Sequence, residues 1–178
     1  AIDDETGREL WKTDGTPSNT IRVKDINPGT TSSSPINLQN LAGTLIFACN
    51  DGAIGLELWR SDGTPSGTFP IDDKLPGSAS SSPTQLANIN GTLYFSANNG
   101  ALGSEPWLTN ATPASTSLVR DISSGSPSSS PTGFILSPNN AQTLFSASNG
   151  TVSSVQANAN DLAVLRRVIL AGADMDIA

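Results

Sequence analysis

The sequence predicts an all-β fold built from a short repeated unit, and three observations carry this prediction. The chain has 178 residues, and three of its segments align without gaps at a spacing of 48 residues. Each segment alternates short aliphatic or aromatic runs with clusters of Gly, Pro, Asn and Ser, which is typical of strands joined by tight loops. Apolar residues at helical spacing occur only in the tail that begins at Thr151.

The same residue types return at equivalent places in each segment. Every copy has a Glu two residues before a Trp, and then a Pro, an Asp, a Gly and a second Pro. These residues are Glu9, Glu57 and Glu105; Trp11, Trp59 and Trp107; Pro17, Pro65 and Pro113; Asp25, Asp73 and Asp121; Gly29, Gly77 and Gly125; and Pro35, Pro83 and Pro131. Three copies in one register indicate an architecture in which each copy forms the same unit.

Each copy contains four short segments with strand character. In the copy that begins at Gly91 they are residues 92–97, 105–108, 117–122 and 134–136. Pro106 suggests that the second strand of this copy lies at an edge or forms a bulge. Four strands in 48 residues are typical of a propeller blade. We therefore expect a β-propeller-like array of about three four-stranded blades over residues 1–150, followed by a short C-terminal helix.

Two of the copies resemble the bacterial ELWxxDGT repeat. Residues 9–16 read Glu-Leu-Trp-Lys-Thr-Asp-Gly-Thr, and residues 57–64 read Glu-Leu-Trp-Arg-Ser-Asp-Gly-Thr. The third copy, residues 105–112, departs from this pattern at Pro106 and at Asn110-Ala111. The resemblance extends to about residue 150. It implies a β-propeller and an extracellular or cell-surface location in a bacterium. The family has no established catalytic residues, so the resemblance implies no active site.

The strands with which the repeats begin and end suggest how the chain assembles. The chain starts just before a second strand at Glu9, and the repeats end with a first strand at residues 143–148. One strand from the C-terminal end and three from the N-terminal end would complete a blade. Three blades are fewer than the four to eight that propellers commonly have, and an open arc leaves strand edges exposed. We therefore expect self-association, or further blades of a longer chain, rather than a stable isolated monomer.

The composition excludes several classes of function. A formal net charge of −7 argues against binding to nucleic acid. The absence of histidine removes the usual nucleophile triads and His-ligated zinc, and the single cysteine excludes an internal disulfide. We expect this residue, Cys49, to be a small buried hydrophobe. No apolar run is long enough for a membrane span. Two carboxylates would suffice for a glycosidase, but the acidic residues recur by blade as scaffold positions do. We therefore predict a protein that is not an enzyme.

Repeated residues supply the candidates for ligand binding. Trp11, Trp59 and Trp107 could stack on sugar rings, although packing between neighbouring blades is the favoured interpretation. Asp25, Asp73 and Asp121 could line a cation site near an axis, and hydrogen bonding to turn amides is favoured instead. The Asp-Gly-Thr segments at Asp14 and Asp62 could bind calcium, and plain hairpin turns are favoured.

The serine-rich loops have two interpretations as well. Residues 30–34, 78–82 and 128–130 could carry O-linked sugars or serve as solvated connectors. Two hypotheses for function remain. The first is an extracellular structural or adhesive scaffold that assembles through blade edges. The second is a lectin-like module that binds glycans.

The tail, residues 151–178, has a different composition. Leu162, Leu165 and Ile169 share one face of a helix predicted over residues 158–170. This segment resembles half of a type I dockerin repeat, whose calcium loop precedes a helix that begins Asp-Leu. The resemblance implies a calcium ligand at Asp161, and a second loop could start at Asp174 and Asp176. The earlier ligand positions of the first loop hold Gly, Val and Ser, which lack carboxylates. We therefore expect a degenerate remnant or a plain capping helix, with calcium as the only cofactor left open.

Overall fold

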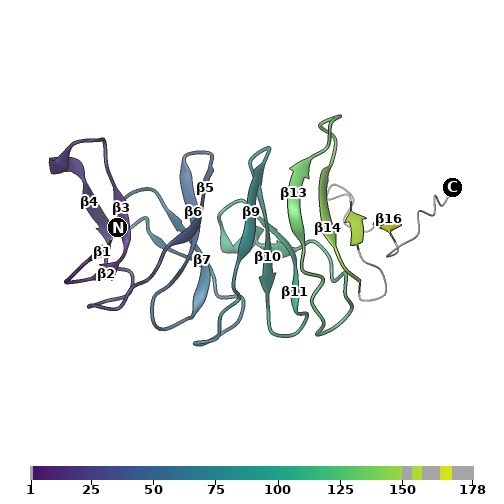
Figure 1. The fold of residues 1–178 in the computed structure, drawn as a ribbon, viewed down its shortest axis with the longest axis horizontal. Helices are drawn as coiled ribbons and strands as arrows, with labels where there is room; N and C mark the ends of the chain where they lie inside the picture. The colour runs from purple at the N-terminus through teal and green to yellow at the C-terminus, as the bar shows by residue number, and fades with distance from the viewer. Residues whose placement is uncertain (1, 150–153, 158–164, 170–178) are drawn as a thin grey trace.

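The chain folds into a row of antiparallel β-sheets (Figure 1). The computed structural model describes residues 2–149, 154–157 and 165–169, and within them only two short 3-10 turns, Pro17–Asn19 and Pro113–Ser115, are helical. The sheets stand side by side along the long axis, with the N-terminal sheet at one end and the C-terminal sheet at the other. The predicted all-β fold class is confirmed.

Within each sheet, strands that are consecutive in the sequence pair with one another in an antiparallel meander. Sheet 1 contains β3 (Leu10–Lys12) and β4 (Ile21–Lys24), and the small hairpin β1 (Ile2–Asp3) and β2 (Gly7–Arg8) precedes it. Sheet 2 contains β5 (Ile36–Leu41), β6 (Thr44–Asn50), β7 (Leu56–Ser61) and β8 (Phe69–Asp72). Sheet 3 contains β9 (Thr84–Ile89), β10 (Thr92–Asn98), β11 (Ser104–Thr109) and β12 (Ser117–Leu118). Sheet 4 contains β13 (Thr132–Leu136), β14 (Thr143–Ala147), β15 (Ser154–Ala157) and β16 (Leu165–Ile169).

The boundaries of the four-stranded units differ from the expected ones. The expected unit ran from Gly91 to Leu136, whereas sheet 3 begins one strand earlier, with β9. The reason is the two-residue turn at Asn90 and Gly91, where both residues have positive φ (52° and 82°), as a tight hairpin between β9 and β10 requires. Residues 134–136 therefore belong to sheet 4. Sheet 1 has two strands rather than the expected three.

Pro106 lies in an interior strand, not at an edge. It is opposite Ser96 of β10, and its carbonyl accepts a hydrogen bond from the backbone N–H of Val119 at 2.8 Å. Proline cannot donate a hydrogen bond in return. This explains why β12 pairs with β11 at two positions only, whereas the equivalent strand of sheet 2, Phe69–Asp72, is longer.

The predicted C-terminal helix is wrong where the structure describes it. Residues 165–169 form β16, which pairs with β15 in antiparallel register. Leu-Arg-Arg-Val-Ile contains a β-branched pair and fits a strand as well as a helix, and pairing with a neighbouring strand decides between the two. Residues 158–164 and 170–178, which contain the rest of the expected helix, lie outside the described residues.

Apolar clusters fill the three spaces between consecutive sheets. The first contains Leu10, Val23 and Ile26 of the first repeat with Phe47, Cys49 and Trp59 of sheet 2. The second joins sheets 2 and 3, and its members include Ile46, Leu58, Ile71, Leu86, Phe95 and Trp107. The third joins sheets 3 and 4, and its members include Ile89, Tyr94, Val119, Phe134 and Phe145. The core is therefore a series of sheet-to-sheet interfaces.

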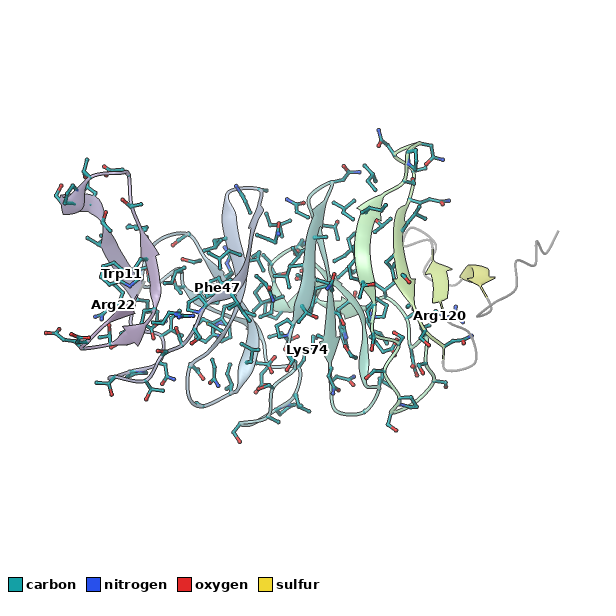
Figure 2. All side chains as sticks on the ribbon, viewed as in Figure 1. Trp11, Arg22, Phe47, Lys74 and Arg120 are labelled. Carbon is teal, nitrogen blue, oxygen red and sulfur yellow. The ribbon has the colours of Figure 1, made fainter. Side chains whose placement is uncertain are left out.

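The sequence favoured packing of the repeated tryptophans between sheets, and the structure confirms this for two of the three; the phenylalanines of β6, β10 and β14 are buried as well. Phe47, Phe95, Phe145, Trp59 and Trp107 are buried. Trp11 is only partly buried. Its equivalents pack against the preceding repeat, and among the described residues only the short hairpin β1–β2 precedes sheet 1. Figure 2 shows Trp11 on the sheet at the N-terminal end of the row.

We expect the substitution Trp59→Ala to lower the free energy of unfolding by about 3–5 kcal/mol, because it opens a cavity in the first interface. Trp11→Ala is the matched control, and it should cost markedly less because Trp11 keeps solvent contact in the folded chain. Urea unfolding followed by circular dichroism measures both. Equal losses for the two variants would contradict the arrangement of stacked sheets.

Candidate functional site

A buried carboxylate links each sheet to the loop that leads into the next one. Glu57 of β7 has an exposed fraction of 0%. It accepts hydrogen bonds from the backbone N–H of Ser81 at 2.6 Å, from the Ser81 hydroxyl, and from the backbone N–H of Lys74 at 3.3 Å. Both partners lie in the connection between sheets 2 and 3. We call this set of bonds the Glu–Ser bracket.

The bracket recurs in the other two repeats with the same geometry. Glu9 accepts hydrogen bonds from the Ser33 hydroxyl at 2.7 Å and from the backbone N–H groups of Ser33 at 3.0 Å and Ile26 at 2.9 Å. Glu105 accepts them from the Ser129 hydroxyl at 2.6 Å and from the backbone N–H groups of Ser129 and Ile122, both at 2.9 Å. Each glutamate is at most 2% exposed.

The serine of each bracket also contacts the following sheet. Its backbone carbonyl accepts a hydrogen bond from the second strand of that sheet or from the residue just after it, over 2.8 to 3.0 Å. The donors are Asn50 to Ser33, Asn98 to Ser81, and Ser148 to Ser129. Each bracket serine therefore donates hydrogen bonds to the sheet before it and accepts a hydrogen bond from the sheet after it.

Neither interpretation of the serine-rich loops anticipated this role. Ser33, Ser81 and Ser129 are at most 1% exposed, so these three residues are neither glycan acceptors nor solvated connectors. The sequence does contain a signal for them, since each serine follows its glutamate by 24 residues in every copy.

The electrostatics of the bracket are those of a structural carboxylate. Burial raises the pKa of Glu57, and the hydrogen bonds from Ser81 and Lys74 oppose that shift without cancelling it. The carboxylate oxygens face backbone and serine donors inside the protein. The bracket therefore fixes the position of a loop and has no access to a substrate.

The repeated tryptophans contact cations from the preceding repeat. The Nζ atom of Lys24 lies 5.8 Å from the centre of the Trp59 ring, and that of Lys74 lies 4.5 Å from the centre of the Trp107 ring. The indole N–H of Trp107 donates to the carbonyl of Ala97 at 3.0 Å. Trp59 and Trp107 are 3% and 7% exposed, so packing leaves no ring face for a sugar. Trp11 alone of the three retains an accessible surface.

The repeated aspartates stay apart from one another, one in each repeat. The Oδ2 atoms of Asp73 and Asp121 accept hydrogen bonds from the backbone N–H groups of Gly77 and Gly125 at 3.3 and 3.0 Å, as the turn interpretation expects. The Oδ1 atoms of both residues and of Asp25 are buried and make no hydrogen bond within the described part of the chain. Among the described residues no three His, Cys, Asp or Glu side chains gather closely enough to hold a metal ion.

The Asp-Gly-Thr segments form self-contained turns. Oδ1 of Asp62 accepts hydrogen bonds from the backbone N–H and the hydroxyl of Thr64 at 2.8 and 2.7 Å. Asp14 makes the same two bonds to Thr16 at 3.0 and 2.7 Å. These bonds lower the pKa of both exposed carboxyl groups. A Cβ atom on Gly67 would overlap the Asp62 carboxylate, which explains the glycine of that repeat. The interpretation as turns is therefore favoured over calcium binding.

The remaining candidate residues contribute little to a site. The predicted calcium ligands Asp161, Asp174 and Asp176 lie outside the described residues. Cys49 is buried as predicted, and burial raises the pKa of its thiol, which makes the group unreactive. A shallow groove of about 460 Å³ lies where β9 and β13 run side by side, and its lining includes Gln39, Asn88 and Ile135.

The chain matches no protein-family model, no curated protein and no solved structure. The part of the chain that the structure describes also contains no helix with the length and hydropathy needed to cross a bilayer. Arguments about function therefore rest on the repeated contacts themselves.

The raised pKa of Glu57 makes a prediction about pH. A carboxyl group whose pKa is higher in the folded state contributes stability that is present below its unfolded pKa, near 4.5, and is lost as the pH rises through the folded pKa. The melting temperature of the parent chain minus that of Glu57→Gln should therefore fall between pH 4.5 and pH 7.

Asp62→Asn provides the control of opposite sign for this experiment. Because the pKa of Asp62 is lowered, its contribution is present above pH 3.8 and is lost only as the pH falls below that value. Calorimetry over pH 3 to 7 measures both differences. A Glu57 difference that rises with pH would contradict the assignment of the shift to burial.

We also expect that a calcium chelator leaves the melting temperature unchanged. The reason is that the Asp-Gly-Thr carboxylates are occupied within their own turns, and the predicted calcium loop lacks its early carboxylates. Calorimetry with EDTA and then with excess calcium is the measurement. A melting temperature that drops with EDTA and recovers with calcium would show a real metal site.

Proposed function

We propose that this chain is a non-catalytic, extracellular or cell-surface repeat protein that acts as a structural or adhesive scaffold and assembles through the edges of its sheets. The single observation that carries the proposal is the Glu–Ser bracket. It commits the repeated buried glutamates to joining one sheet to the next, and the bracket is the same in each joint. An enzyme would be expected to depart from the repeat at one place, where unique polar side chains converge.

We further propose that the sheets are blades of a β-propeller. Sheets 2, 3 and 4 are four-stranded meanders stacked face to face, and their first strands lie next to one another. Asn37 of β5 donates to the carbonyl of Pro83 at 3.2 Å, and Asn88 of β9 donates to the carbonyl of Asn40 at 2.7 Å. Neighbouring first strands are what a shared central axis requires. A ring of ordinary size needs more sheets than the described ones, so the proposal includes partner sheets.

The exposed apolar residues support assembly. Leu38 of β5 is 50% exposed and Ile135 of β13 is 58% exposed, the two highest values among the large hydrophobic side chains described. Association would remove this surface from water. Equivalent surfaces repeated along a scaffold also gain strength from multivalency.

A lectin-like module is the second candidate. The groove beside β9 and β13 favours it, because amide side chains next to apolar surface suit a sugar. The accessible face of Trp11 is a second possible stacking surface.

Two measurements on the 178-residue chain separate these functions. For the scaffold we expect light scattering at micromolar concentration to show particles well above the chain mass of 18.3 kDa, and a glycan array to give no reproducible signal. Binding to one sugar class that is lost in Trp11→Ala would favour the lectin. A well-folded particle near the chain mass would overturn assembly through sheet edges.

A further inference from the structure

Cross-strand Phe–Trp pairs occur in sheets 2 and 3, the two sheets that contain both a repeated Phe and a repeated Trp. Phe47 of β6 lies opposite Trp59 of β7, and Phe95 of β10 lies opposite Trp107 of β11. The third members of the two series are Phe145 of β14 and Trp11 of β3. They belong to the sheets at opposite ends of the row (Figure 1), so each lacks the other.

The strands that carry these two residues also have open edges. Within the described residues β3 pairs with β4 only, so the edge that would face a second strand is unpaired. Among the residues that the structure describes, β14 pairs with β15 at Ser146 and Ala147, whereas the ladder between β6 and β7 runs from Leu45 to Asn50. β15, Ser-Val-Gln-Ala, has neither the Glu nor the Trp of the equivalent strands.

The two most exposed large apolar residues, Leu38 and Ile135, occupy positions that pack between sheets elsewhere in the row. Leu38 is equivalent to Leu86 and Phe134, which the preceding sheet buries to 9% and 6% exposure. Tyr94 of that sheet stacks on Phe134, with ring centres 6.0 Å apart. Ile135 is equivalent to Ala87, which packs in the same interface from the covering side. Within the described part of the chain, Leu38 therefore lacks the first two strands of a preceding sheet, which would cover it. In the same part of the chain, Ile135 lacks a following sheet on which it could pack.

We propose that the β13–β14 hairpin of one copy completes the β3–β4 sheet of a second copy. This junction rests on the proposed scaffold function and names its partner as a second copy of this chain. Phe145 then lies opposite Trp11, Ile135 covers Leu38, and β15 gives up its two pairings on β14. A sheet of the same repeat is the chemically matched occupant because sheets 2 and 3 each contain the same Phe–Trp pair.

The junction also brings a cation toward Trp11. Arg120 holds in the third repeat the position that Lys24 holds in the first, where the lysine lies over Trp59. The second repeat has Asp72 at this position, and Lys74 supplies the cation over Trp107. In the junction Arg120 therefore faces Trp11 of the second copy. The contact is head-to-tail, so two copies close a ring of six sheets, within the common range for propellers, or further copies extend it.

The test uses three variants of the chain and sedimentation velocity. Leu38→Lys blocks the acceptor end, and Ile135→Lys blocks the donor end. Both residues are exposed, so neither change should disturb folding, and circular dichroism checks this. Phe69→Ser is the matched control, because Phe69 is also exposed but lies on the outer strand β8, where the third repeat has Ser117.

The junction predicts that each lysine variant alone associates about a hundredfold more weakly, because a charge would be buried without a partner. An equimolar mixture of the two should restore a particle of two chains, since each supplies the end that the other lacks. The control should behave as the parent chain does.

The outcomes separate the junction from the scaffold function. Assembly of both lysine variants like the parent, or a mixture that stays monomeric, overturns the junction and leaves the scaffold function standing. A parent chain that is itself monomeric overturns both.

Discussion

The hydrogen bonds of the Glu–Ser bracket fix how each sheet sits on the next, and the rest of the structure depends on them. A carboxylate that is almost completely buried costs free energy unless its oxygens are satisfied. Here they are satisfied by a loop that has already left the sheet of the glutamate. The buried charge therefore makes one position of the loop much more favourable than any other. Each sheet starts from that loop, so its strands inherit the position.

The bracket also explains a backbone feature of the same loops. The residue after each bracket serine has positive φ, namely Ser34 (50°), Ser82 (50°) and Ser130 (48°). The bracket serine must direct its N–H and hydroxyl toward one sheet and its carbonyl toward the other. The chain must then turn back so that the next N–H can bond to the preceding repeat, as Ser82 does to the carbonyl of Leu56. A left-handed serine is unfavourable by itself, and the bonds on both sides hold it in place.

The sequence predicted those features that depend on local pattern. The alternation of apolar residues correctly predicted strands, and the shared position of the tryptophans correctly predicted the burial of Trp59 and Trp107 but not that of Trp11. The sheet boundaries could not be predicted in this way, because both the Asn-Gly turn and the serine-rich loop follow a strand. Only the strand pairing in the structure shows that the Asn-Gly turn joins two strands of one sheet, whereas the serine-rich loop joins two sheets. Ser81 was missed because its partner lies 24 residues away and it stands within a run of similar serines, of which Ser82 is exposed.

A second series of links between sheets shows how far the repeats are equivalent. Lys12 of β3 donates to the carbonyl of Gly63 in the next repeat at 2.8 Å, and Arg60 of β7 donates in the same way to the carbonyl of Ala111 at 3.1 Å. Ala111 replaces the glycine of the Asp-Gly turn, yet it keeps a positive φ of 72° and is buried. The contact with Arg60 and the surrounding core hold the turn after its glycine has been lost.

The next residue in this series is Leu108, whose side chain has no hydrogen-bond donor. The joint between sheets 3 and 4 therefore relies on the Glu105–Ser129 bracket and on the aromatic contacts of Phe134 with Tyr94 and Phe145. These rings pack together in the apolar cluster between the two sheets. In the proposed junction, sheet 4 exchanges its outer strands while its first two strands, β13 and β14, stay in place. The proposal thus requires β14 to keep Phe145 in the core, where it is 3% exposed, while its other edge pairs with β3 of the second copy.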